Sequence, residues 1–414
     1  MNIGFIGLGK LGLPCALAID SVKKHNVMGF DVDSNVNEYL IDRKIPYREE
    51  GAHELLETHD ISFDSPENVI KNSDIIFLPI QTPHDEMYEG VTRIPDSRVD
   101  FDYSFLKEGV KEVSNILDDL KKEKIIVIIS TVLPGTIDRE IKPILSKYAK
   151  LCYNPFFIAM GTTINDFMNP EFVLMGVDDK EAASTLKEFY STLHSKDVFE
   201  CSINEAELIK VSYNTFITMK ICLANTVTEL SHKLTNIDSD KVMGALKISN
   251  QRLISSKYLD GGMGDGGGCH PRDNIALSWL SREVDLSYDW YENLMISREK
   301  HTEWLVDLTI NKAKENNLDI CILGKSFKKE TNLTVGSPSL LFDSILREKG
   351  FTAELYDPHI DSGEPPTDKA KVYFIATNHD TFKDYNFPKN SIVIDPWRII
   401  TNNIDIELVS IGRS

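Results

Sequence analysis

The sequence lacks a long apolar segment and a recognisable leader. Among its 414 residues the longest purely aliphatic run is residues 125–129, whereas a membrane-spanning helix needs roughly 18 or more apolar residues. The first residues, MNIGFIGLG, contain no basic region and no small-residue cleavage site, which argues against secretion. We therefore predict a cytoplasmic protein without a membrane span.

Positive charge is also scarce. Lys and Arg number 45 against 64 Asp and Glu, which gives a formal net charge of −19. An acidic chain of this kind is not expected to bind nucleic acid or an anionic membrane as its main partner. A small anionic ligand stays compatible with this charge, because a few local cations can hold one.

The six cysteines, at positions 15, 152, 201, 222, 269 and 321, include no C-x-x-C pair. Their spacing matches neither a zinc site nor a disulfide framework, so we predict no metal and a reducing compartment. Most of them are expected to be buried small apolar side chains, with Cys269 as the exception because of its neighbours. The apolar share of 42% and the charged share of 26% are typical of a globular chain and exclude a disordered or fibrous one.

Short apolar runs alternate with helical patterns over the first 200 residues, which predicts a parallel sheet covered by helices. The strands are expected at residues 2–6, 27–30, 74–78 and 124–129, with a helix at 105–120. A long helix follows at residues 203–234 and begins with the S-x-x-E capping box of Ser202 and Glu205. A helix of this length usually links domains or forms an oligomer interface.

A second α/β pattern follows a glycine cluster at 261–268 and an amphipathic stretch at 286–316. Its strands are expected at residues 320–323, 352–356, 372–376 and 391–394, with a helix at 339–348. The chain is thus predicted to be an α/β protein in three parts, with an α/β domain at 1–201, a helical centre at 202–306 and a second α/β domain at 307–414.

The first strand leads into a G-x-G-x-x-G turn that opens a helix. Gly7 allows the tight turn, Gly9 lets the backbone approach a pyrophosphate, and Gly12 allows close packing of helix on strand. Asp31 ends the next strand, where a carboxylate accepts a hydrogen bond from a ribose hydroxyl and favours NAD over NADP. The alternative is a glycine-rich turn without a ligand. The residues assigned to the cofactor in this turn are Gly7, Gly9, Lys10, Leu11 and Gly12.

Two more loops follow predicted strands. Thr82 and Pro83 come after the strand at 74–78, and Thr131 lies in the loop after the strand at 124–129. Ligands of open α/β sheets bind beyond the carboxyl ends of the strands, so these loops are expected to line the cofactor crevice. The alternative is ordinary turn and cap chemistry.

Lys210 and Asn214 lie one turn apart on the long helix, and Asn225 returns to the same face. Such a pair is usually solvated, but the neighbouring residues are mostly apolar, so we expect this face to be packed. Cys269 directly follows the glycine cluster and precedes His270, Arg272 and Asp273. Nearby positive charge or a helix N-terminus activates a thiol, so we interpret Cys269 as a nucleophile.

A nicotinamide site together with a nucleophilic cysteine suggests a two-step oxidation. An alcohol becomes an aldehyde, the thiolate captures it as a thiohemiacetal, a second oxidation gives a thioester, and water releases the acid. Lys210 and Asn214 would stabilise the oxyanions.

The motifs together resemble the UDP-glucose, UDP-N-acetylmannosamine and GDP-mannose dehydrogenase family, from residue 3 to about residue 398. They are GFIGLGKLGLP at 4–14, STVLPGT at 130–136, EAELIKVSYNTF at 205–216, GMGDGGGCHPRD at 262–273, LGKSFKKET at 323–331 and YDP at 356–358. The resemblance implies two Rossmann-like domains joined by a long helix, usually paired as homodimers. It also implies oxidation of the C6 alcohol of a nucleotide sugar, most closely UDP-glucose, with two NAD⁺.

The resemblance also assigns roles. Cys269 matches the nucleophile, Lys210 and Asn214 match the oxyanion and water-handling pair, and Asp273 matches the supporting acid, with Thr131 as a further catalytic candidate. The residues that match substrate contacts are Phe157, Lys210, Asn214, Arg252, Gly266, Phe327, Lys328 and Arg398.

Several positions depart from the family pattern. Phe156 and Met160 stand where the family has glutamates, and neither side chain can transfer protons. Leu333 and Val335 replace an aspartate and an arginine, and Asp265 replaces an aromatic residue. Thr131 or Asp273 could handle the water in place of the missing glutamate. Two alternatives stay open, namely an impaired homologue that only binds nucleotide sugar and a two-electron β-hydroxyacid dehydrogenase.

Overall fold

A computed structural model describes residues 1–83, 85–233, 236–251, 257–258, 260–286, 288–363, 365–401 and 405–413, without the side chains of Thr226 and Leu230. The chain forms two compact units. The first comprises Met1–Pro83 and Phe101–Ser212, and the second comprises His84–Asp100 and Tyr213–Ser414. None of the helices among the described residues is both long and apolar enough to cross a membrane. The three-part division predicted above stays a prediction.

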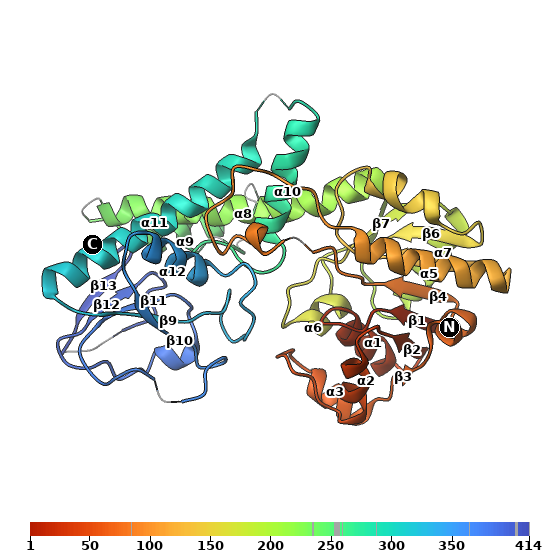
Figure 1. Ribbon diagram of the computed structural model, residues 1–414, viewed down its shortest axis with the longest axis horizontal. Coiled ribbons are helices and arrows are strands. Elements are labelled where there is room, and N and C mark those ends of the chain that lie inside the picture. Colours follow the sequence, from red (N-terminus) through yellow and green to blue (C-terminus); the bar gives the residue numbers. More distant parts are fainter. Residues whose placement is uncertain are drawn as a thin grey trace. The chain divides into compact units, whose positions relative to one another are not determined.

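An eight-stranded sheet forms the centre of the first unit (Figure 1), with the order β3-β2-β1-β4-β5-β6-β7-β8. The strands are β1 (Asn2–Ile6), β2 (Asn26–Phe30), β3 (Ser62–Phe63), β4 (Ile75–Leu78), β5 (Lys124–Ile128), β6 (Ala149–Tyr153), β7 (Val173–Val177) and β8 (Val198–Cys201). All neighbours pair in parallel except β6 and β7, which are antiparallel. The order reverses between β1 and β4, and this switch point is where such sheets bind ligands.

Helices cover this sheet because each carries an apolar face. They are α1 (Gly12–Ser21), α2 (Ser34–Ile41), α3 (Ala52–Thr58), α4 (Pro66–Asn72), α5 (Ser104–Leu120), α6 (Thr163–Met168) and α7 (Lys180–Ser191). In α5 the buried residues Leu106, Val110, Val113 and Leu117 follow the helical period. On the strands, Ile3 and Phe5 of β1 belong to the main apolar core of this unit.

The predicted strands of the first unit are confirmed to within one residue at each end. The strands β3, β6, β7 and β8 were not predicted. In β8 no residue is fully buried, and β3 has only two residues, so neither contains the continuous apolar run that marks the buried parallel strands.

The long helix α8 spans Ile203–Lys233. Its capping box forms as predicted, since the backbone N–H of Ser202 donates to Glu205 Oε2 at 2.8 Å and the N–H of Glu205 donates to Ser202 Oγ at 3.3 Å. Leu234, the last residue of the predicted helix, lies outside the described residues. Residues of α8 up to Ser212 belong to the first unit, and those from Tyr213 belong to the second.

The second unit contains a five-stranded, fully parallel sheet with the order β10-β9-β11-β12-β13. Its strands are β9 (Ile320–Leu323), β10 (Ala353–Tyr356), β11 (Val372–Ile375), β12 (Ile392–Asp395) and β13 (Glu407–Ser410), and its further helices are α9 (Ser239–Ile248), α10 (His270–Glu283), α11 (Trp290–Asn316) and α12 (Pro338–Glu348). Residues of α11 and α12 pack with Ile320 and Ile322 on one face, while Cys321 and Leu323 pack with Phe382 and Phe387 on the other. The predicted α/β class with two Rossmann-like parallel sheets is therefore confirmed, although the first sheet carries one antiparallel pair.

The cysteines differ in burial. Cys15, Cys152 and Cys321 are buried, as expected, whereas Cys201 and Cys222 are partly exposed, as is Cys269. The expectation of a buried apolar role is thus wrong for Cys201 and Cys222. The described cysteines are all reduced.

Candidate active site

The glycine turn between β1 and α1 has the geometry of a dinucleotide loop. Gly7 has φ +113°, and its N–H donates to the carbonyl of Phe30 at 2.8 Å. A Cβ at Gly12 would overlap the carbonyl oxygen of Gly7 and lie 2.9 Å from Pro79 Cγ, so only glycine fits. A Cβ at Gly9 would meet no atom within 4 Å. The turn therefore leaves open space at its second glycine, where a pyrophosphate approaches in this kind of site.

Asp31 follows β2 and lies beside this turn. Its Oδ2 accepts a hydrogen bond from the N–H of Leu8 at 2.6 Å, and its Oδ1 accepts one from the N–H of Asp33 at 2.9 Å. Its side chain is partly exposed, and each carboxylate oxygen keeps a second lone pair for a hydroxyl donor. Together with the exposed Gly9 and Lys10 and the half-buried Leu11, these residues fit NAD.

The loops after β4 and β5 meet each other. Thr82 is buried and donates from Oγ1 to the carbonyl of Thr131 at 2.8 Å. Pro79 of the β4 loop lies under the glycine turn, and Pro83 is partly exposed at the end of that loop. The structure thus places the predicted cofactor residues of these two loops at the same edge of the sheet.

Sequence analysis missed Glu207, a fully buried carboxylate on α8. It accepts hydrogen bonds from the N–H groups of Gly135 at 2.6 Å and Ile137 at 2.8 Å, just beyond the loop that contains Thr131. Burial raises the pKa of Glu207 to about 7, and the two N–H donors oppose that shift only in part. The sequence signal that could have identified Glu207 is its position three residues before Lys210, on the same packed face of the helix.

Lys210 lies 6% exposed on the first-unit part of α8. Its Nζ donates to the carbonyl of Phe156 at 2.9 Å and lies 5.1 Å from the ring centre of Phe157. The side chain of Phe156 packs instead on Phe167, with ring centres 5.2 Å apart. The structure therefore brings Lys210 and Phe157 together. The ammonium group of Lys210 is bound by the backbone oxygen of residue 156, the position where the family has a glutamate.

In the second unit, Cys269 is the N-cap residue of α10, directly after the glycine-rich loop. One turn later, the fully buried Asp273 accepts a hydrogen bond from Asn214 Nδ2 at 2.6 Å and an ion-pair contact from Arg272 at 3.1 Å. His270 Nδ1 lies 3.3 Å from the carbonyl of Asn214. Asn214 and Asp273, two predicted site residues, are thus joined by a hydrogen bond at the first turn of α10, the helix that follows Cys269.

The glycine-rich loop packs closely on the second α/β region. A Cβ at Gly266 would lie 2.9 Å from Phe327 Cβ, and one at Gly267 would lie 3.1 Å from its ring. Lys328 Nζ is 5.7 Å from the same ring. The predicted substrate residues Gly266, Phe327 and Lys328 are therefore neighbours, and Val335 beside them is 42% exposed.

Two predicted arginines remain to be placed. Arg252 lies outside the described residues. Arg398 donates to Asp240 Oδ1 at 2.9 Å, to the carbonyl of Gly261 at 3.0 Å and to that of Ile411 at 3.2 Å. Its guanidinium therefore joins segments of the fold, which a sequence pattern could not reveal.

Comparison with known proteins gives a consistent result. Residues 1–194 match the NAD binding domain of the UDP-glucose/GDP-mannose dehydrogenase family, and residues 204–297 match the central domain of that family. A UDP-glucose 6-dehydrogenase of Rickettsia conorii is 26% identical over 97% of this chain and 96% of its own length. A GDP-mannose 6-dehydrogenase of Pseudomonas aeruginosa is 26% identical over 87% of this chain and 82% of its own length. The structure of a UDP-glucose dehydrogenase from Pyrobaculum islandicum superimposes with a TM-score of 0.86 at 22% identity, covering 100% of this chain and 98% of that one.

Proposed function

The chain belongs to the UDP-glucose/GDP-mannose dehydrogenase family and oxidises a nucleotide sugar with NAD; within that class, we propose that it converts the C6 alcohol of UDP-glucose to a carboxylate. The observation that carries the proposal is the buried contact between Asn214 and Asp273 in the first turn of α10, the helix that has Cys269 as its N-cap residue. A relative that shares nearly the full length is named UDP-glucose 6-dehydrogenase. The family also acts on other nucleotide sugars, so the sugar has to be tested.

The turn of Gly7, Gly9 and Gly12 with Asp31 would hold the cofactor. When bound, NAD accepts a hydride in each of the two oxidations, so one sugar consumes two NAD⁺. The chain's own residues supply the remaining chemistry. The loops with Thr82 and Thr131 would line the crevice beside the turn.

Cys269 is the proposed nucleophile. It is the N-cap residue of α10 and is partly exposed, so a substrate carbonyl can reach its sulfur. The thiolate adds to the carbonyl carbon of the aldehyde, and the oxygen takes up a proton to give a thiohemiacetal. After the second oxidation the sugar is a thioester, and water then breaks the C–S bond to release the acid and the thiol.

Charge and proton handling are proposed for four other residues. Lys210 supplies a cation, and Asn214 supplies an amide donor, to oxygens that become negative during the reaction. Phe156 cannot act as a base, so Thr131 or the buried Asp273 is proposed to handle the water. Phe157, Gly266, Phe327 and Lys328, with Arg252 and Arg398, remain proposed substrate contacts.

An NADH-release assay tests this proposal. The parent protein should release two NADH per sugar with UDP-glucose, and it should be compared on UDP-N-acetylglucosamine, UDP-N-acetylmannosamine, UDP-galactose and GDP-mannose. Cys269→Ser should abolish uronate, while the control Cys201→Ser, at another partly exposed thiol, should leave it unchanged. Uronate production by Cys269→Ser at the parent rate would show that the nucleophile is assigned wrongly.

A second candidate is a homologue that binds nucleotide sugar without turning it over. Phe156 favours this candidate, because its ring packs on Phe167 and cannot transfer a proton. In this case UDP-glucose should raise the melting temperature of the protein, while no sugar yields NADH. Turnover with any of the five sugars excludes it.

We also propose that the chain works in the cytoplasm as a homodimer paired through α8. This helix leaves large apolar side chains exposed, namely Leu208, Phe216 and Leu223. Light scattering after size exclusion should give twice the chain mass, and Leu223→Glu should shift it towards the monomer.

A further inference from the structure

A buried ion pair holds the glycine-rich loop that precedes Cys269. Arg298 of α11 and Asp265 of the loop are each 4% exposed, and Arg298 Nε lies 2.8 Å from Asp265 Oδ1. The same guanidinium donates to the carbonyls of Asp265 at 3.0 Å, Gly90 at 2.8 Å and Gly336 at 3.2 Å. The side chain of Arg298 therefore binds three separate segments of the second unit.

The pair continues as a chain of hydrogen bonds to the first turn of α10. Thr218 of α8 donates to Asp265 Oδ2 at 2.7 Å, and Asn274 Nδ2 donates to Thr218 Oγ1 at 3.1 Å. Asn274 Nδ2 also donates to the carbonyl of His270 at 2.8 Å, directly next to Cys269. Thr218 and Asn274 are completely buried, so each bond of this chain forms away from water, where losing a partner costs most.

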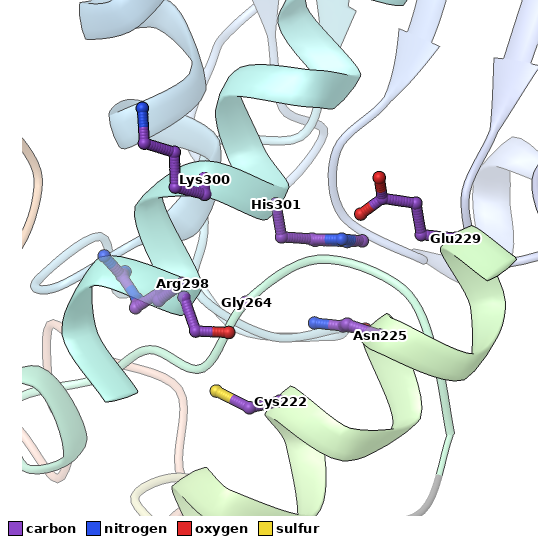
Figure 2. A pocket seen from close by; sticks show the side chains of 8 residues that line it. Cys222, Asn225, Glu229, Gly264, Arg298, Lys300 and His301 are labelled. Atoms are coloured by element: carbon purple, nitrogen blue, oxygen red, sulfur yellow. The ribbon is translucent and has the colours of Figure 1, made fainter. Parts of the chain in front are cut away.

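The start of this loop is held by apolar packing, because Met263 lies in a buried cluster with Leu305 and Val306 of α11. Gly264 borders a cavity of about 180 Å³, with Cys222, Asn225 and Glu229 of α8 on one side and Arg298 and His301 of α11 on the other (Figure 2). The loop thus passes from apolar packing at Met263 to a cavity at Gly264. At the next residue, Asp265, polar contacts with Arg298 and Thr218 hold it.

We propose that Arg298, Asp265, Thr218 and Asn274 are positioning residues for the Cys269 thiol. They do not touch the reacting atoms. They fix the loop against α8 and α11, so that Cys269 keeps its position and orientation at the N-terminus of α10. The proposal rests on the proposed role of Cys269 as nucleophile, but its first test does not require turnover.

That test is the rate at which iodoacetamide alkylates Cys269 between pH 6 and pH 9, followed on the Cys269 peptide by mass spectrometry. Thr218→Val removes the central hydroxyl, and Arg298→Lys removes the fork that reaches three carbonyls. Thr309→Val is the matched control, because this buried hydroxyl donates only to Leu305 within α11. Thr218→Ser keeps the hydroxyl and should restore the parent behaviour.

We expect Thr218→Val and Arg298→Lys to slow alkylation at pH 7 at least fivefold and to change its pH dependence, with Thr309→Val within twofold of the parent. In the dehydrogenase assay kcat should fall about tenfold while KM for NAD stays within twofold. Equal alkylation rates and pH profiles in Thr218→Val, Arg298→Lys and Thr309→Val overturn the proposal. Slowed alkylation in a protein that turns over no sugar supports the positioning role and refutes the proposed function instead.

Discussion

The two sheets of this protein carry the same loop geometry and use it differently. In the first, Gly7 donates its N–H to the carbonyl at the end of β2, and Asp31 accepts from the N–H of Leu8. In the second, the N–H of Gly324 donates to the carbonyl of Tyr356 at the end of β10, at 2.7 Å. There Asp357 accepts from the N–H of Lys325 at 2.7 Å.

The difference lies in what else each carboxylate contacts. Asp31 is partly exposed beside the open space at Gly9. Asp357 is completely buried and also contacts Ser326 and the ring of His379, which lies 3.2 Å away. Burial opposes the ionisation of Asp357, but the bonds from His379 and from three backbone N–H groups outweigh it and hold its pKa well below the usual range.

We therefore propose that the first arrangement binds a ligand, whereas the second stabilises the fold. The N–H of Glu330 donates to His379 Nδ1 at 3.0 Å, so Nε2 carries the proton that faces Asp357. His379 therefore offers no lone pair to a metal, although Glu330, His359 and His379 lie close together. Substitutions at matched positions of the two loops should separate binding from stability.

The largest effect is expected from Asp357→Ala. It leaves three backbone N–H groups and His379 without their acceptor and should lower the free energy of unfolding by about 3–5 kcal/mol. The measurement is urea denaturation followed by circular dichroism. Asp31→Ala is the control and should cost less than about 1 kcal/mol, because its site is partly exposed. Equal losses of unfolding free energy in the two variants would mean that both carboxylates stabilise the fold to the same extent.

The next effect separates Gly324 from Gly9. Gly324 has φ +104°, and a Cβ there would lie 2.6 Å from the backbone nitrogen of Thr377. Gly324→Ala should therefore lower the free energy of unfolding by about 2 kcal/mol. Gly9→Ala should leave the unfolding curve unchanged and raise KM for NAD severalfold, since its methyl group enters only the open space. A destabilised Gly9→Ala would contradict the assignment of that space to the cofactor.

A third carboxylate, Glu207, caps the loop after β5 from a helix. Its pKa is raised to about 7, so the folded state binds the proton more tightly than the unfolded state, and stability should fall as pH rises from about 5 to about 8. The expected loss over this range is about 2 kcal/mol. Glu207→Gln cannot ionise, so its free energy of unfolding should stay flat over this range. Parallel pH curves for parent and variant would rule out titration of Glu207 as the cause.

The smallest effect is expected at Asp31. Asp31→Asn keeps an acceptor for Leu8 but loses the charged acceptor for a ribose hydroxyl, which should raise KM for NAD about tenfold, or about 1.4 kcal/mol. The same variant should use NADP better than the parent does, because the carboxylate that repels a 2′-phosphate is gone. Unchanged kinetics with both cofactors would remove Asp31 from the binding site.

The features that could be predicted from sequence are those whose causes are local. The glycine turn, Asp31 and the Ser202–Glu205 cap each depend on a few neighbouring residues, and all three have the expected local geometry. The contacts that stayed hidden join distant segments. Thr218 and Asp265 are hydrogen-bonded although they lie 47 positions apart in the sequence. Glu207 and Ile137 are hydrogen-bonded over a separation of 70 positions. Arg398 matches a substrate residue in sequence, yet its partners Asp240 and Gly261 come from the fold.

The anchor of Lys210 has a consequence for how this chain can vary. Its ammonium is held by the main-chain oxygen of residue 156, and every amino acid provides that atom. Codon 156 can therefore mutate without taking away the acceptor of the lysine. A laboratory selection for faster turnover of a nucleotide sugar can therefore start from the single substitution Phe156→Glu.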